Sequence, residues 1–166
     1  MKRIAVIITA MLLLAGGALA LGIVTGPFSD KDAATVAAND PAFYNALGYK
    51  LAQDGNAVDA QAAFARAVEL DQDYENARSN LATIAFNNGD YASAIEQLRW
   101  LVENNPANGN YHFDLAQNLA SDARYKTADP GELKEAASEF DVAASFGVEN
   151  AASNAAVVRN VVAEFS

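Results

Sequence analysis

The sequence contains few side chains of the kinds that carry out acid–base, nucleophilic or metal chemistry. It has no cysteine and a single histidine, His112, which excludes thiolate nucleophiles, cysteine-based metal sites and paired-histidine sites. A lone histidine in an apolar helical segment is typical of a packing or surface residue rather than a ligand or a catalytic base. The residue types therefore favour a protein that is not an enzyme and holds neither a metal ion nor a cofactor.

Acidic side chains occur in pairs at helical spacing, Asp114 with Asp122 and Glu135 with Glu139. General acid–base catalysis needs an apolar pocket that shifts the pKa of one partner, and no such pocket is predictable around either pair. We expect both pairs to face solvent. The net charge of −10 also makes nucleic acid and anionic headgroups poor partners.

A short pattern of glycine, small or polar residues, alanine and a bulky residue occurs twice. It begins at Gly55 and again at Gly89, an offset of 34 residues. Each glycine stands where a helix would end in a left-handed residue, which glycine adopts without a Cβ penalty. One turn separates Ala60 from Phe64 in the helix that follows, so that a small residue allows close approach and a bulky one fills the seam. The pattern predicts an all-α fold of antiparallel helix hairpins.

The period and the residue types resemble the tetratricopeptide repeat family, whose helix pairs stack into a solenoid. The resemblance implies a repeat domain over residues 41–166, with repeats near 41–74, 75–108 and 109–148 and a capping helix at 149–165. Eight surplus residues within 121–130 interrupt the third repeat, and they predict either a longer first helix or a protruding loop. The matching residues are Tyr44, Leu47, Gly48, Gly55, Ala60, Phe64 and Ala67, then Leu81, Ala82, Gly89, Tyr91, Ala94, Leu98 and Pro106, then Leu115, Ala116, Leu119, Gly131, Ala136, Phe140 and Ala143.

The first 25 residues predict membrane targeting. A basic start at Lys2 and Arg3 precedes an apolar run from residue 4 to residue 24, which as a helix would span about 30 Å. One interpretation is a signal peptide cleaved after Ala20, and the other is a retained signal-anchor transmembrane helix. Both interpretations place the rest of the chain in the periplasm, either anchored to a bacterial inner membrane or soluble. Residues 26–40 are expected to form a linker.

The family resemblance also implies a binding surface, because the first helices of its repeats line a peptide-binding groove. The corresponding positions here carry amides, hydroxyls and aromatic rings and no charge, which suits a neutral or mildly apolar peptide. The chaperone-tail clamp of the family is not expected, because it needs cations where this chain has Asn45, Asn110 and Asp114. The expected protein-binding residues are Asn45, Tyr49, Asn76, Ser79, Thr83, Phe86, Asn87, Phe113 and Gln117, and the same set of positions includes Gln53, Asn110 and Ser121.

Other interpretations of these side chains are open. Phe86 and Phe113 are also suited to packing between helices. A second candidate surface is Trp100 with Arg99 and Tyr91, since tryptophan and arginine are common at binding hot spots, although Trp100 is also suited to packing between repeats. The inserted segment, residues 123–130, is a third candidate surface.

These observations favour a non-catalytic scaffold that mediates protein–protein interaction in the bacterial cell envelope. An accessory or assembly subunit of a membrane-associated complex is the expected role, with a membrane or periplasmic protein as partner and no small-molecule substrate. One alternative is a periplasmic client-binding chaperone resembling the tetratricopeptide repeat proteins of cytochrome c maturation. An alternative of another class, which the residue types disfavour, is a small periplasmic enzyme or metal-binding protein.

Overall fold

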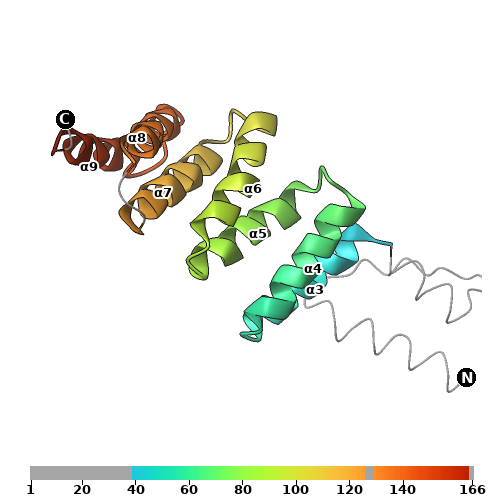
Figure 1. Cartoon of the computed structure of the whole chain (residues 1–166). Coiled ribbons are helices and arrows are strands. Elements are labelled where there is room, and N and C mark those ends of the chain that lie inside the picture. The colour runs from blue at the N-terminus through green and yellow to red at the C-terminus, as the bar shows by residue number, and fades with distance from the viewer. Residues whose placement is uncertain (1–38, 126–128, 165–166) are drawn as a thin grey trace, which may run out of the picture. The chain divides into compact units, whose positions relative to one another are not determined.

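A computed structural model of the chain describes residues 39–125 and 129–164, and within these ranges it contains seven α-helices and no strand. The expected all-α fold of antiparallel helix pairs is thereby confirmed. The helices, labelled as in Figure 1, are α3 (Pro41–Gln53), α4 (Ala57–Leu70), α5 (Glu75–Asn87), α6 (Tyr91–Asn104), α7 (Gly109–Tyr125), α8 (Pro130–Ser145) and α9 (Ala151–Glu164).

The predicted signal peptide or membrane anchor, residues 1–25, lies outside the described residues, as does most of the predicted linker. Within the described ranges no helix has both the length and the hydropathy needed to cross a bilayer.

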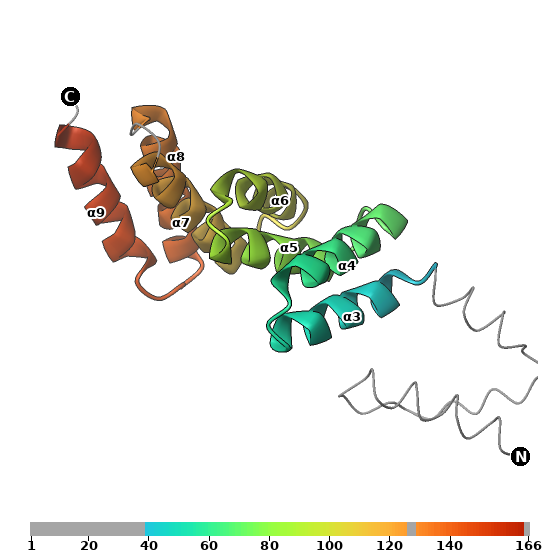
Figure 2. The same cartoon turned by 60° about the horizontal axis from the view of Figure 1, so that its bottom comes forward.

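The chain divides into two compact units, and the division falls within α5, between Ala77 and Arg78. The described part of the first unit is dominated by the hairpin of α3 and α4, which lie side by side (Figure 2). Gly55 has a φ of 80° and ends the turn between the two helices, as its position in the repeat predicts. Gly48 of α3 faces the buried ring of Phe64 on α4 so closely that the hairpin has no room for a Cβ atom there.

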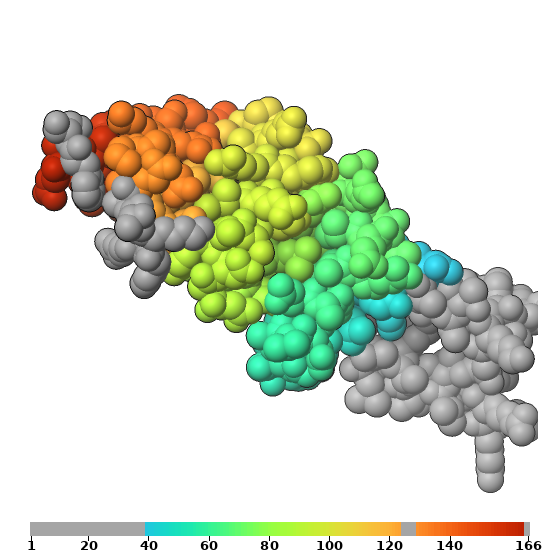
Figure 3. All heavy atoms as spheres, viewed as in Figure 1, coloured from blue at the N-terminus to red at the C-terminus, as the bar shows by residue number. Residues whose placement is uncertain are grey.

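The second unit contains the rest of α5 and the four helices that follow it. Gly89, with a φ of 75°, ends α5, and the side chain of Asp90 caps α6 by accepting a hydrogen bond from the backbone N–H of Ser93 (3.2 Å). α7 packs against α6 and α8, and α9 packs against α8. In the space-filling view the atoms of α6, α7 and α8 form a continuous surface that runs from yellow to orange (Figure 3). Buried residues of all five helices share one core: Ala82, Ala85, Ala94, Leu98, Leu101, Leu115, Ala116, Leu119, Ala123, Leu133, Ala136, Ala137, Phe140, Ala143, Ala151, Ala155 and Val158.

The surplus residues of the third repeat extend its first helix. α7 has 17 residues and continues to Tyr125, so the longer-helix interpretation is confirmed up to that residue, while residues 126–128 lie outside the described part. α8 then begins at Pro130, and the carboxylate of Asp129 accepts a hydrogen bond from the backbone N–H of Gly131 (2.8 Å).

Candidate functional site

The residues expected to form the binding groove are divided between the two units. On α3, in the first unit, Asn45 is half-buried, Gln53 is exposed, and Tyr49 has 58% of its surface exposed. Asn76, in the first turn of α5, is also exposed and belongs to the first unit. Tyr49 is therefore available to a partner, as a groove residue must be.

On α5, in the second unit, the expected groove residues are only partly free for a partner. The hydroxyl of Thr83 donates a hydrogen bond to the carbonyl oxygen of Ser79 (3.0 Å), so it is used within the helix. Phe86 is half-buried, packs against the core and meets the ring of Tyr91 edge-on at 5.8 Å. The packing interpretation of Phe86 is thus supported, and Asn87 is the most accessible of these side chains as an exposed amide at the helix end.

On α7, Phe113 is half-buried, and its ring meets that of Phe140 on α8 edge-on at 5.3 Å. The side chain of Gln117 is exposed, and its backbone carbonyl oxygen accepts a hydrogen bond from the hydroxyl of Ser121 (2.8 Å). Phe113 therefore has a packing role and yet keeps part of its surface open.

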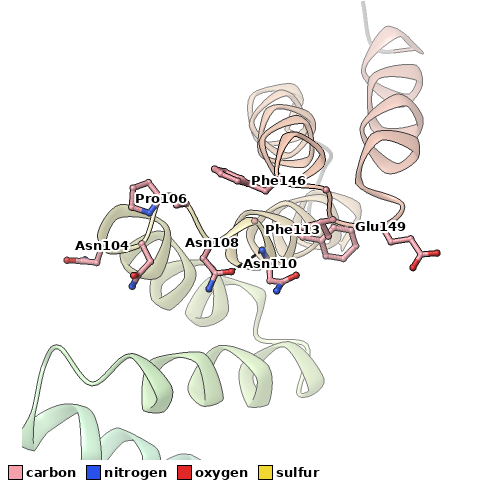
Figure 4. A pocket seen from close by; sticks show the side chains of 12 residues that line it. Asn104, Pro106, Asn108, Asn110, Phe113, Phe146 and Glu149 are labelled. Atoms are coloured by element: carbon pink, nitrogen blue, oxygen red, sulfur yellow. Dashed lines mark hydrogen bonds between the residues drawn. The ribbon is translucent and has the colours of Figure 1, made fainter.

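The second unit has an open hollow of about 1010 Å³ at the start of α7 (Figure 4). Asn104 and Pro106 lie at one end of it and Glu149 at the other, with Phe113 and Phe146 between them. Two of the expected groove positions, Asn110 and Phe113, line the hollow. The complete lining is Asn104, Asn105, Pro106, Ala107, Asn108, Gly109, Asn110, Phe113, Phe146, Gly147, Val148 and Glu149.

Two connections form the walls of the hollow, the α6–α7 loop (residues 105–108) and the α8–α9 loop (residues 146–150). The side-chain oxygen of Asn108 accepts a hydrogen bond from the backbone N–H of Asn110 (3.2 Å) at the start of α7. In the other loop Gly147 has a φ of 80° and Asn150 a φ of 63°, which turn the chain sharply from α8 into α9. The start of α7 and the α8–α9 loop lie close together. A Cβ atom added to Gly109 would be only 2.6 Å from the Cβ atom of Phe146.

The lining is rich in amides and nearly uncharged. Among the described residues that form it, four are asparagines, Glu149 is the one ionisable side chain, and Phe146 has 49% of its surface exposed. Amides can donate to and accept from an extended backbone, and exposed rings offer apolar contact. The arrangement can hold a peptide, but it supplies no nucleophile, and no group of three or more acidic or histidine side chains among the described residues is placed to bind a metal ion.

Of the four acidic side chains expected to face solvent, only that of Asp114 is exposed. Asp122 is buried, and Glu135 and Glu139 are half-buried. The Oε2 atom of Glu139 lies 2.6 Å from Nδ1 of His112. Partial desolvation raises the pKa of Asp114 above its ordinary value.

The second candidate surface consists of residues with internal contacts. The guanidinium of Arg78 lies over the ring of Trp100 at 4.3 Å from its centre, and Trp100 packs against the core. Arg99 donates to both carboxylate oxygens of Glu135 on α8 at 2.9 Å. These contacts support the packing interpretation of Trp100.

Sequence reasoning missed most of the hollow, including Phe146, Asn104 and Asn108. The run of asparagines from residue 104 to residue 110 was the available signal, because so many amides beside one proline mark a loop with many donors and acceptors. No residue near this run in the sequence indicates that the α8–α9 loop lies beside it.

Comparisons with known proteins agree with this architecture. The sequence model described as tetratricopeptide repeat matches residues 51–119. The solved structure titled MamA 41-end, from Desulfovibrio magneticus RS-1, is similar with a TM-score of 0.60 and 18% identity, over 81% of this chain and 80% of that one.

A second solved structure, titled MamA RS-1 ArsTM double mutant, is similar with a TM-score of 0.52 and 19% identity, over 76% of this chain and 75% of that one. No curated protein matches the chain significantly. Identities this low show the shared fold alone. The family match and the left-handed glycines at Gly55 and Gly89 show together that residues 51–119 carry tetratricopeptide repeats.

Proposed function

We propose that the chain is a non-catalytic scaffold whose second unit binds an extended segment of another protein in the hollow at the start of α7. The observation that carries this proposal is the lining itself, which combines four asparagines with the rings of Phe113 and Phe146. A neutral peptide with an apolar side chain fits this lining, because the amides pair with its backbone and the rings contact its side chain. A strongly acidic peptide is disfavoured by Glu149 and by the net charge of −10.

The test selects peptides from a random library on the full-length chain and measures their affinity for two variants. Asn110→Arg places a bulky cation in the hollow, and Asn160→Arg places the same cation on the exposed side of α9. We expect Asn110→Arg to weaken binding at least tenfold, about 1.4 kcal/mol, and Asn160→Arg to leave the affinity unchanged. Equal affinity of the two variants would exclude the hollow as the binding site.

The wider groove is tested by a third variant, Asn87→Arg on α5. Weaker binding in Asn87→Arg, together with unchanged binding in Asn110→Arg, would move the site from the hollow to the expected groove face of α5. Phe86→Ala tests the same face of α5 more severely, although it also removes a packing contact.

We further propose that the scaffold works in a bacterial cell envelope as an accessory or assembly subunit of a membrane-associated complex. The support for this location is the basic start and the uncharged run of residues 4–24. Anchoring would raise the effective concentration of a membrane-bound partner. Carbonate extraction of membranes tests the anchor: a full-length chain that stays with the membrane fits a retained helix, and release of a chain that begins after Ala20 fits a cleaved signal peptide.

A further inference from the structure

One buried imidazole connects the segments that frame the hollow. His112, the fourth residue of α7, has 6% of its surface exposed. Its Nδ1 lies 2.6 Å from Oε2 of Glu139 on α8, and its Nε2 lies 3.0 Å from the carbonyl oxygen of Pro106 in the α6–α7 loop. Its ring also stacks on that of Phe146, with 6.2 Å between ring centres and 22° between planes. Pro106 and Phe146 both line the hollow.

The two polar contacts of this ring require an additional proton. The carbonyl oxygen of Pro106 and an ionised Glu139 carboxylate can only accept hydrogen bonds, whereas a neutral imidazole has one donor and one acceptor. Both contacts are hydrogen bonds only if both ring nitrogens of His112 carry protons, or if the carboxyl of Glu139 carries one. With neither proton present, one ring nitrogen has a lone pair that points at the lone pair of an oxygen. That contact is then no hydrogen bond, and the buried oxygen has lost its donor.

The charged group in contact with this ring favours a second proton, because it is a carboxylate. α8 presents the carboxylate of Glu139, the α6–α7 loop presents the Pro106 carbonyl, and the α8–α9 loop presents Phe146 with Glu149 further along. Asp114 follows two residues later on α7 itself. α6, which also packs against α7, carries Glu103 and Arg99, and Arg99 is paired with Glu135 on α8. The ionisable group that contacts the ring is the acidic Glu139.

We propose that His112 and Glu139 form a proton-dependent clamp on the hollow. With the proton bound, the imidazole holds the α6–α7 loop and α8 together. Without it, one of the two contacts is lost and the wall of the hollow loosens. The sign follows from the proton count, because the clamped form binds one proton more than the loosened form and is therefore favoured at lower pH. The inference that the clamp regulates peptide binding rests on the proposed function. The clamp itself can be tested without a ligand.

The test is a nuclear magnetic resonance titration of the isotope-labelled full-length chain between about pH 5 and pH 8, the range in which histidine changes charge. Because the chain has one histidine, the ring gives a single set of nitrogen signals. We expect the extra proton to be present at the low end, on the ring or on the Glu139 carboxyl, and the backbone amide signals of Asn108 and Val148 to shift with the same midpoint as the group that carries it. A ring with one proton throughout together with an unchanged Glu139 carboxyl carbon signal, or loop signals that follow neither group, would overturn the clamp.

Two glutamate variants separate the clamp from a general pH effect. In Glu139→Gln the new amide can donate to Nδ1 of a neutral ring while Nε2–H still donates to the Pro106 carbonyl, so both contacts persist without the extra proton. We expect its loop signals to lose their pH dependence with the fold retained. Glu135→Gln removes a charge from the same helix away from His112, and its loop signals should titrate as in the wild type.

Loop signals that titrate equally in the Glu139→Gln and wild-type chains would refute the clamp. A failure to select any peptide for the hollow would refute the proposed function and leave these signals, and hence the clamp, unaffected.

Discussion

The close approach of α7 to the α8–α9 loop makes Gly109→Ala a sensitive test of how the hollow is built. Gly109 is buried in the first turn of α7, and an added Cβ atom would lie 2.6 Å from Cβ of Phe146 and 2.9 Å from Cγ2 of Val148. The Cβ atom of Phe146 is bonded to the backbone, so rotation of its side chain cannot make room. The α8–α9 loop itself must move.

The expected cost follows from two opposing effects. Inserting a methyl group into a packed site costs about 1–3 kcal/mol. Replacing glycine by alanine recovers about 0.4–1 kcal/mol, because it reduces the conformational freedom of the unfolded chain. The free energy of unfolding should therefore fall by about 1–2 kcal/mol, which changes the folded-to-unfolded ratio by a factor of about 5–30.

The assay is urea unfolding followed by far-ultraviolet circular dichroism, and Gly131→Ala is the matched control. Gly131 occupies the first turn of α8, and its added Cβ atom would meet only the movable carboxylate oxygen of Asp129, at 3.2 Å. We expect a lower transition midpoint for Gly109→Ala with an unchanged slope, and a midpoint near that of the wild type for Gly131→Ala. Equal midpoints for the two variants would show that Gly109 is not confined by the α8–α9 loop.

Three further predictions concern other parts of the fold. Gly48→Ala should destabilise the first unit, because the new Cβ atom would lie 2.7 Å from two ring carbons of Phe64, and Phe64→Leu in the same chain should relieve part of the clash; a double-mutant cycle without coupling would contradict this. Leu101→Ala empties a site with 0% exposure and should lower the free energy of unfolding by about 2–5 kcal/mol in urea titrations, and a change below about 1 kcal/mol would contradict its central place in the core. Desolvation raises the pKa of Asp114, so its contribution favours the folded state below the ordinary carboxyl value of about 3.9 and is lost as the pH rises through the higher folded value. Asp114→Asn should remove that dependence in unfolding measured from acid to neutral pH, and a slope like that of the wild type would refute the assignment.

The hairpins were predictable because their signals are local. Gly55 and Gly89 have the left-handed backbone that a tight reversal requires, and Ala60, Phe64 and Leu98 are buried on the helices that follow them. These features depend on residues only a few positions apart, so spacing alone revealed them.

The candidate site was predictable only in part, because it depends on contacts between distant residues. His112 and Glu139 meet across a separation of 27 positions, and nothing near either residue indicates the other. Glu139 was expected to face solvent because the sequence shows its helical spacing from Glu135. The sequence does not show that His112 is its partner. Phe146 is a comparable case, because its place beside the start of α7 depends on how α8 packs.

The single tryptophan of the chain has a practical consequence for studying it. Trp100 belongs to the second unit, where it lies beneath Arg78, and the first unit has tyrosines but no tryptophan of its own within the described residues. Its fluorescence emission therefore reports the melting of the second unit. A thermal transition seen by this emission at a temperature different from the loss of total helicity would show that the two units melt independently.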